Sequence, residues 1–247
     1  MSIKAKVKSV LFKTLGAMLQ DDRPKIVYYH DILGLEKTKM ATPFELFKAH
    51  VDICKKNHWN FTKGIPQRKK EVMFFVDDGF RGVWDHHEWL ISQNLYPTTS
   101  VAIEKIGRAG YLTWEQIKTL HSLGFNFISH TWSHKSLTEC SVEELYHELR
   151  DARVFLSDKL EEDVTSICFP RGLFSNKVID VAAECGYTTG LASVPGSASE
   201  FECFNKHLKV YPRNLVQFSS PAEFEGILNG AMTPFQQYYL KRHFVQE

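Results

Sequence analysis

The stretch Val-Met-Phe-Phe-Val-Asp-Asp-Gly, at positions 72–79, decides the fold class of this chain. It begins with a short apolar run of aromatic and β-branched residues, which is typical of a buried strand. The run ends abruptly in two carboxylates and a glycine. In α/β folds the reactive groups collect at the carboxyl ends of the strands. The stretch therefore predicts a buried strand that delivers polar chemistry at that end.

Four further runs of the same kind predict a mainly parallel sheet. They lie at 25–29, 98–103, 125–129 and 165–169. Helical patterns separate them, and capping boxes beginning at Thr113, Ser141 and Ser220 predict where three helices start. Strands that alternate with helices need crossover connections, so we expect an α/β fold with parallel strands.

The organisation of the chain predicts one domain over residues 1–247. We find no internal repeat, low-complexity tract or linker, and α/β barrels commonly reach this size. We expect a core over about 25–215, an amphipathic helix over 1–22 and a helical tail over 219–247. Apolar residues and lysines share the first segment. Two interpretations stay open for it: a helix docked on the domain, or a basic contact with a membrane surface.

Charge and cysteine content narrow the class of function. Lys plus Arg number 30 against 29 for Asp plus Glu, so the chain lacks the basic excess of a nucleic-acid-binding protein. The five cysteines are scattered without a C-x-x-C pair, which favours reduced thiols over a zinc knuckle. No apolar run approaches the ~20 residues of a membrane span, and no signal peptide is indicated. We expect a cytoplasmic protein, with peripheral contact at the inner membrane face as an alternative.

Four predicted strand ends carry concentrated polar chemistry. They are His30-Asp31, Asp77-Asp78-Gly79, His130-Thr131 with His134, and Pro170-Arg171-Gly172. Adjacent carboxylates would repel each other in one dry pocket, and a divalent metal ion would remove that conflict. Asp77 and Asp78 can share a site if the chain bends at Gly79. One carboxylate could then bind the metal while the other accepts a proton.

The two histidines that follow the strand at 125–129 suit the same metal site. His130 and His134 are four residues apart, so both imidazoles reach one face if the chain turns helical after Ser129. Two histidines and one carboxylate leave open positions for water and substrate, as in catalytic zinc sites. The pattern therefore predicts a catalytic metal site rather than a structural one.

These motifs resemble the polysaccharide deacetylases related to the rhizobial chitooligosaccharide deacetylase, carbohydrate esterase family 4. The family's T-F-D-D-G is matched by Phe75-Val-Asp-Asp-Gly79, and its H-[ST]-x-x-H by His130-Thr-Trp-Ser-His134. Its R-x-P-x-G is matched in part by Cys168-Phe-Pro-Arg-Gly172. The resemblance covers roughly residues 25–215, in the order that the family has.

The resemblance implies a distorted (β/α)7 barrel with an Asp-His-His metal site. The ligands would be Asp78, His130 and His134, and Asp77 would be the catalytic base. The Arg171 backbone N–H, which follows Pro170, would hold the oxyanion. The metal would be a divalent ion, zinc first, with cobalt, nickel or manganese as alternatives. The residues expected to contact the substrate are Thr131, Pro170, Trp132 and Arg213.

The chain departs from the family at three motifs. Cys168 stands where the family has the arginine that orients the base, and the fourth-motif Asp–Trp pair and the C-terminal L-x-H are not visible. The segment 28–32, Y-Y-H-D-I, resembles the N-terminal segment of biofilm poly-N-acetylglucosamine deacetylases, which makes His30 the candidate general acid. Asp31 would fix the tautomer of His30 or cap a loop. Arg213 would replace the missing arginine or form a surface salt bridge.

We therefore expect a hydrolase that removes an N-acyl group, acetyl in first place, from an amino sugar. The substrate would be a surface-polysaccharide precursor, nucleotide-linked or lipid-linked, or an oligosaccharide. One alternative is a catalytically silent sugar-binding or metal-binding protein of the same fold; another is a hydrolase of a formyl group or a cyclic imide. Retention of both Asp77 and Asp78 favours the enzyme, because a pure binder has little use for the base. Tyr28, Trp132 and Phe174 would form an apolar floor for a sugar ring, or pack in the core.

Overall fold

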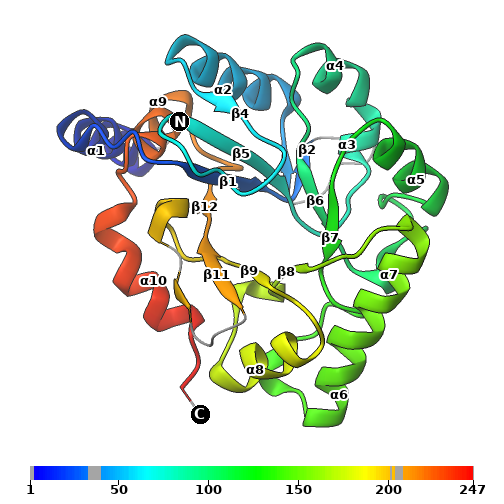
Figure 1. The fold of residues 1–247 in the computed structure, drawn as a ribbon. Helices are drawn as coiled ribbons and strands as arrows, with labels where there is room; N and C mark the ends of the chain where they lie inside the picture. Colours follow the sequence, from blue (N-terminus) through cyan, green and yellow to red (C-terminus); the bar gives the residue numbers. More distant parts are fainter. Residues whose placement is uncertain (1–2, 33–39, 201, 204–207, 247) are drawn as a thin grey trace.

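A computed structural model describes residues 3–32, 40–200, 202–203 and 208–246 of the chain. Residues 1–2 and 247, at the ends of the two expected terminal segments, lie outside the described residues. The strands form an almost closed ring with helices on its outside (Figure 1). In spatial order they are β10 (Glu202–Cys203), β11 (Lys209–Pro212), β9 (Thr189–Ala192), β8 (Ser166–Cys168), β7 (Phe127–Ser129), β6 (Thr98–Val101), β5 (Glu71–Val76), β1 (Lys25–Tyr29) and β12 (Asn214–Leu215).

The ring closes through a strand that changes partners. Only Arg213 separates β11 from β12; β11 pairs with β9, and β12 pairs with β1, both in parallel. Counted as one passage, they complete seven parallel strands in the described part of the chain. The predicted distorted (β/α)7 barrel is therefore confirmed. Three short strands lie beside it: β2 (Asp31–Ile32) pairs with β3 (Ala41–Thr42), and β4 (Asn60–Phe61) pairs with β5.

The described part of the chain has ten α-helices. They are α1 (Ile3–Leu19), α2 (Phe44–Lys56), α3 (Gly82–Asp85), α4 (His87–Ser92), α5 (Trp114–Ser122), α6 (Val142–Tyr146), α7 (Ala152–Leu160), α8 (Asn176–Glu184), α9 (Pro221–Leu228) and α10 (Gln236–His243). The hydroxyls of Thr113, Ser141 and Ser220 each accept a backbone N–H three residues on, and all three capping boxes are complete. These start positions are confirmed.

The first helix docks on the ninth. A Cβ placed on Gly16 of α1 would lie 2.7 Å from the Cα of Gly226 in α9, so the two backbones cross closely there. Ser9 and Ser220 share a hydrogen bond of 2.9 Å beside this crossing. Helix α1 is therefore packed on the barrel, as one of the two interpretations expected. No helix in the described part of the chain combines the length and the apolar content that crossing a membrane requires.

The sequence patterns did not predict the strands that close the barrel. The predicted strand at 25–29 has the bounds of β1, but the run at 98–103 ends as a strand at Val101 and passes into a 3-10 turn. Strands β9, β11 and β12 were not predicted. β9 reads Thr-Gly-Leu-Ala, and a Cβ on Gly190 would lie 2.9 Å from the ring of Phe169. The close approach requires glycine there, and glycine breaks the β-branched pattern that marks the other strands.

Acid should destabilise the fold through His50 of α2, which is fully buried. Its Nδ1 accepts from the Tyr29 hydroxyl, and its Nε2–H donates to the Ser219 carbonyl, both at 2.9 Å. Burial lowers the pKa of His50 to about 4 from 6.5, although the bond to Ser219 raises it. As the pH falls through 6.5, His50 binds a proton in the unfolded chain but stays neutral in the folded chain. The free energy of unfolding should therefore drop by about 3 kcal/mol between pH 6.5 and pH 4.

Urea titrations over that pH range would measure this drop. His50→Gln should be less stable at pH 7 and should lose much less stability on acidification. His58→Asn is the matched control, because His58 is exposed and lies just after the end of α2. An equal loss in the wild type and in His50→Gln would show that other groups cause the acid sensitivity.

Candidate active site

The predicted reactive residues converge at the carboxyl ends of the barrel strands. Asp77 and Asp78 follow β5, His130 follows β7, and Cys168 ends β8. A pocket of ≈ 530 Å³ is lined by Asp77, Asp78, His130 and His134 together with His30 from the end of β1. Residues from three strand ends that are far apart in the chain therefore share one cavity.

The two aspartates share the pocket because the backbone turns at Asp78 itself. Asp78 has φ = 70° and Gly79 has φ = 75°, so the extended conformation of β5 stops immediately after Asp77. A Cβ on Gly79 would lie 3.0 Å from a methyl of Val101, which leaves little space for a side chain. The expected bend is present, and it includes a left-handed aspartate as well as the glycine.

Asp78, His130 and His134 place their ligand atoms together. Asp78 Oδ1 lies 3.4 Å from His130 Nε2 and 3.0 Å from His134 Nε2, and the three ligand atoms lie within 4.8 Å of one another. Burial raises the pKa of Asp78, but its interactions with the two histidines outweigh this effect and hold that pKa well below its usual range. Asp78 is therefore an ionised carboxylate with two imidazole nitrogens beside it. Lys105 Nζ also contacts Asp78 Oδ1, at 3.0 Å.

The second ring nitrogen of His130 fixes its tautomer. Its Nδ1–H donates to the Cys168 carbonyl at 2.7 Å, and its Nε2 faces Asp78, where a metal ion could take the place of the proton. A metal-binding histidine commonly donates its other N–H to a carbonyl or carboxylate in this way. The three residues thus fit a divalent metal ion in donor type, spacing and hydrogen bonding.

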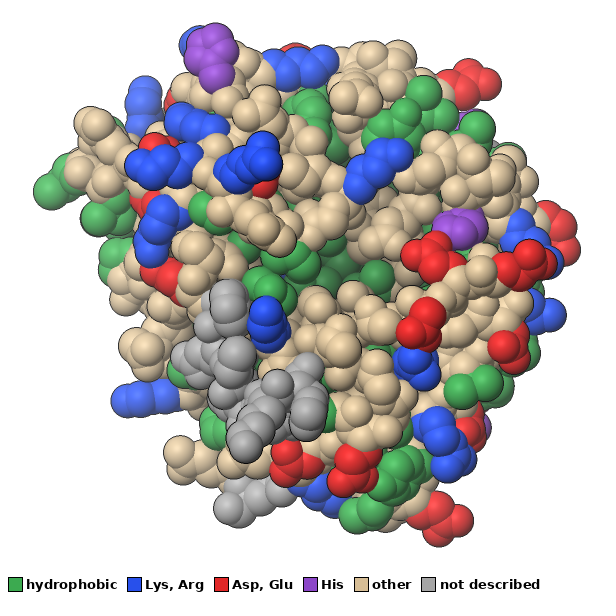
Figure 2. Space-filling view, viewed as in Figure 1, with side chains coloured by type: hydrophobic (Ala, Val, Ile, Leu, Met, Phe, Trp, Pro, Cys, Tyr) green, Lys and Arg blue, Asp and Glu red, His purple; other side chains and the backbone are tan. Residues whose placement is uncertain are grey.

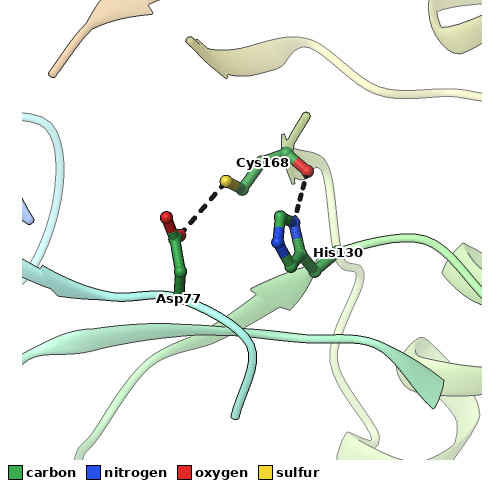
Figure 3. A group of neighbouring side chains, drawn as sticks. All are labelled: Asp77, His130 and Cys168. Atoms are coloured by element: carbon green, nitrogen blue, oxygen red, sulfur yellow. Dashed lines mark hydrogen bonds between the residues drawn. The ribbon is translucent and has the colours of Figure 1, made fainter. Parts of the chain in front are cut away.

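Asp77, His130 and Cys168 also lie close enough to hold an ion, as Figure 3 shows. However, Asp77 Oδ1 already accepts hydrogen bonds from Arg213 at 2.8 Å, Ser100 at 3.1 Å and the Cys168 thiol at 3.2 Å. Three donors therefore occupy this oxygen, and the Nδ1 of His130 is committed to the Cys168 carbonyl. This second group therefore fits a metal ion less well than the first.

Arg213 is buried and bonds to Asp77. It is 1% exposed, and its guanidinium lies 4.3 Å from the ring centre of Tyr28 and 4.7 Å from that of Phe75. Burial raises the pKa of Asp77, but the charges of Arg213, His130 and His30 lower it by more. The net effect is a pKa below the usual value of an aspartate. Arg213 is therefore not part of a surface salt bridge. It lies where an arginine can hold Asp77 ionised, while Cys168 contacts the same oxygen.

His30 lies in the same pocket and is oriented by a residue that the sequence did not indicate. Its Nδ1 is 2.7 Å from Gln217 Oε1, and Gln217 is buried just after β12. Asp31 instead bonds to the backbone at Gly82, and burial raises its pKa to about 6. Asp31 therefore lies in β2 and bonds to the backbone at the start of α3, and the residue that orients the His30 ring is Gln217 instead.

The loop from His130 to His134 is not helical, so the expected helical turn was wrong. Thr131 has φ = 70° and His134 has φ = 65°, and the His134 N–H donates to the Thr131 hydroxyl at 3.1 Å. The two rings meet because this loop folds back, with their centroids 4.7 Å apart. Spacing of four residues predicted the meeting of the histidines but not the conformation that produces it.

Three of the four residues expected to contact the substrate lie away from the pocket lining. Thr131 is buried within its loop, Pro170 is buried, and Trp132 packs between Phe155 and His147. Of the expected apolar floor, Tyr28 lines the pocket, while Phe174 is buried against Phe169 and Phe244. Arg213 and Arg171 do line the pocket.

The two ends of the chain contribute pocket residues that the sequence did not indicate. Lys8 and Phe12 come from α1, and Tyr239 and His243 come from α10. A Cβ on Gly172 would lie 3.1 Å from His243 Nδ1, so this histidine packs directly on the third-motif loop. A single histidine in a helical tail carries no spacing signal, so the sequence alone assigns it no role.

An ionised aspartate and an Asp-His-His group at the carboxyl ends of a (β/α)7 barrel define a hydrolase-type site. The chain belongs to the polysaccharide deacetylase family, whose model matches residues 64–190. It is similar to the Bacillus subtilis protein YxkH, named for the same family, with 24% identity over 198 residues that cover 74% of this chain and 70% of that protein.

Two solved structures share the fold. The deacetylase PplD of Streptococcus pyogenes, in complex with acetate, superposes with a TM-score of 0.71 at 21% identity, covering 83% of this chain and 98% of that one. IcaB of Ammonifex degensii superposes with a TM-score of 0.71 at 17% identity, covering 86% and 98%. The narrower resemblance of residues 28–32 to the biofilm branch stays a prediction.

The two candidate metal groups can be separated by variants unique to each. Protein reconstituted with zinc should hold about one ion per chain, as expected for one set of two histidines and one carboxylate. His134→Ala removes a ligand of the first group only, and should lose most of the ion. Cys168→Ser alters the second group only, and should keep it. Metal analysis after gel filtration would measure both, and loss in Cys168→Ser with retention in His134→Ala would reverse the assignment.

Proposed function

We propose that the protein is a metal-dependent carbohydrate N-deacetylase that hydrolyses the N-acyl group, acetyl in first place, of an amino sugar. The observation that carries the proposal is Asp77, a buried carboxylate held by Arg213 beside a group that suits a metal ion. A divalent ion, zinc first with cobalt, nickel or manganese as alternatives, held by Asp78, His130 and His134 would act as a Lewis acid on the amide and on water.

Asp77 is the proposed general base. Ser100, Cys168 and Arg213 all donate to the Oδ1 atom of Asp77. The Oδ2 atom is therefore the one proposed to take the proton from water. Arg213 keeps the carboxylate ionised at neutral pH and fixes its orientation. In the reaction, the water oxygen bonds to the carbonyl carbon, the C–N bond breaks, acetate leaves and the nitrogen gains a proton.

His30 is the proposed general acid. With its Nδ1–H donated to Gln217, the ring can give and regain a proton at Nε2 without losing that hydrogen bond. Protonation of the nitrogen is needed because an amide anion is a very poor leaving group. The Arg171 backbone N–H, in a left-handed turn with φ = 59° at the pocket wall, is the proposed oxyanion donor.

The proposed substrate is a surface-polysaccharide precursor, and the proposed location is the cytoplasm or the inner membrane face. A catalytically silent binder is less well supported, because Arg213 supplies the ion pair that Cys168 cannot. Hydrolysis of a formyl group or a cyclic imide would use the same residues. Mass spectrometry of N-acetyl and N-formyl amino sugars incubated with the zinc-loaded protein would identify the acyl group.

Asp77→Asn tests the base. Asparagine preserves the shape of the side chain but cannot accept the proton, so turnover should fall by ~10²–10⁴-fold. Metal content should remain at the wild-type level, because Asp78 and the two histidines are intact. Free amine released from N-acetylglucosamine oligomers would be measured next to bound zinc. An empty metal site in Asp77→Asn would mean that the two aspartates exchange roles.

His30→Ala tests the acid against His243, the pocket histidine that comes from α10. Turnover should fall by ~10²–10⁴-fold at unchanged metal content. His243→Ala, which removes a pocket histidine from α10, should have the smaller effect on kcat. A larger loss of kcat in His243→Ala than in His30→Ala would assign the acid to the C-terminal helix.

A further inference from the structure

Helix α1 is apolar on two opposite sides. Its inner side packs on the barrel through Phe12 and Gly16. Its outer side carries Val7, Leu11 and Met18, spaced to lie along one face, and Val10 next to them. Val10 is 65% exposed and Met18 is 76% exposed. A helix with apolar side chains on two opposite sides normally has a partner on each side, and the described residues cover only the inner one.

The exposed apolar side chains of the molecule gather around this helix. Nine of the twelve large exposed hydrophobic residues in the described part of the chain lie on α1 or in the segments 215–218 and 235–238. The ring of Phe235 stacks on Phe12, and Ser220, which follows the first segment, bonds to Ser9 of α1. A concentration of this kind marks an interaction surface, whereas scattered apolar residues do not.

The charge of α1 favours an anionic bilayer as the occupant of this surface. The helix sequence contains four lysines and no acidic residue. Lys8 and Lys13 are exposed and lie on the two flanks of the outer apolar face. Figure 2 shows hydrophobic side chains projecting at the left edge of the molecule, where α1 lies in Figure 1, with Lys and Arg side chains beside them. Apolar residues flanked by lysines suit a helix that lies in the headgroup region of a membrane.

The catalytic pocket is continuous with this helix. Its lining includes the catalytic carboxylates and also an apolar group made by Phe12, Leu215, Ile227 and Met232. This apolar group can contact a hydrocarbon chain as well as the face of a sugar ring. Two cationic residues, Lys8 from α1 and Arg171 from the third-motif loop, line the same pocket. Together these side chains suit a substrate with a sugar, a phosphate and a hydrocarbon chain.

We propose that α1 lies on an anionic bilayer and that the pocket takes an N-acyl amino sugar joined through a phosphate to a membrane lipid. The proposal rests on the proposed deacetylase function and names its substrate class. The lipid remains in the bilayer beside the outer face of α1, its first carbons contact the apolar lining, and the sugar reaches Asp77.

Vesicle co-sedimentation tests the surface without any catalysis. The full-length, zinc-loaded protein should bind vesicles containing phosphatidylglycerol, bind phosphatidylcholine vesicles at least tenfold more weakly, and dissociate at high salt. Val10→Glu/Met18→Glu should weaken binding at least tenfold. Val142→Glu/Val154→Glu is the matched control, because it adds the same charge at two exposed valines of α6 and α7 and should leave binding unchanged.

Turnover on two substrates then tests the pocket. The probes are an N-acetylglucosamine oligomer in solution and N-acetylglucosamine joined through a phosphate to a polyprenol in phosphatidylglycerol vesicles. Val10→Glu/Met18→Glu should reduce turnover of the lipid-linked probe at least tenfold and leave that of the soluble oligomer unchanged. The control pair should change neither.

The outcomes separate this inference from the function on which it rests. Turnover of the soluble oligomer without any vesicle binding would overturn the membrane inference and keep the deacetylase. Vesicle binding without turnover of either probe would overturn the function and keep the surface. A wild-type dimer that Val10→Glu/Met18→Glu converts to a monomer in sedimentation velocity, without vesicle binding, would identify the outer face of α1 as a contact between two copies.

Discussion

The buried ion pair between Arg213 and Asp77 constrains the interior of the barrel. A lone charge in such a dry place costs several kcal/mol, and removing one partner of a buried pair leaves the other uncompensated. Arg213 meets that cost with Asp77 at 2.8 Å and with the aromatic faces of Tyr28 and Phe75. Because Arg213 also separates β11 from β12, the residue that orients the proposed base stands where the closing strand changes partners. Barrel closure and the state of Asp77 therefore depend on the same side chain.

The contact between Arg213 and Asp77 fits with the presence of Cys168 where the family has an arginine. An arginine at that position would approach Asp77 from β8, but Arg213 reaches the same oxygen from between β11 and β12. Two guanidinium groups could not share Asp77 Oδ1 without repulsion. A buried thiol 3.2 Å from that oxygen is a small, neutral neighbour, and its backbone carbonyl still orients His130.

Features that depend on neighbouring residues could be predicted from the sequence. The meeting of single residues that are distant in the chain could not. The strand at 25–29, the three capping boxes and the order of motifs each depend on neighbours in the chain, so a short window contains the physical cause. Gln217 beside His30 and His243 beside Gly172 depend on closure of the barrel. The helical turn after Ser129 failed for a different reason. Spacing of four predicts proximity through a helix, whereas left-handed residues at Thr131 and His134 reach it through a loop.

The site loops contain backbone conformations that L-residues rarely adopt. Asp78, Thr131, His134 and Arg171 all have φ between 59° and 70°. Each such residue costs of order 1 kcal/mol or more and persists only where the surroundings determine it. Here the determinants are the proposed functional contacts themselves: the Asp78–histidine cluster, the Thr131 hydroxyl on the His134 N–H, and the packing of His243 on the Gly172 loop. The barrel strands supply a rigid base for these turns, and the helices at the two ends of the chain close the pocket above them.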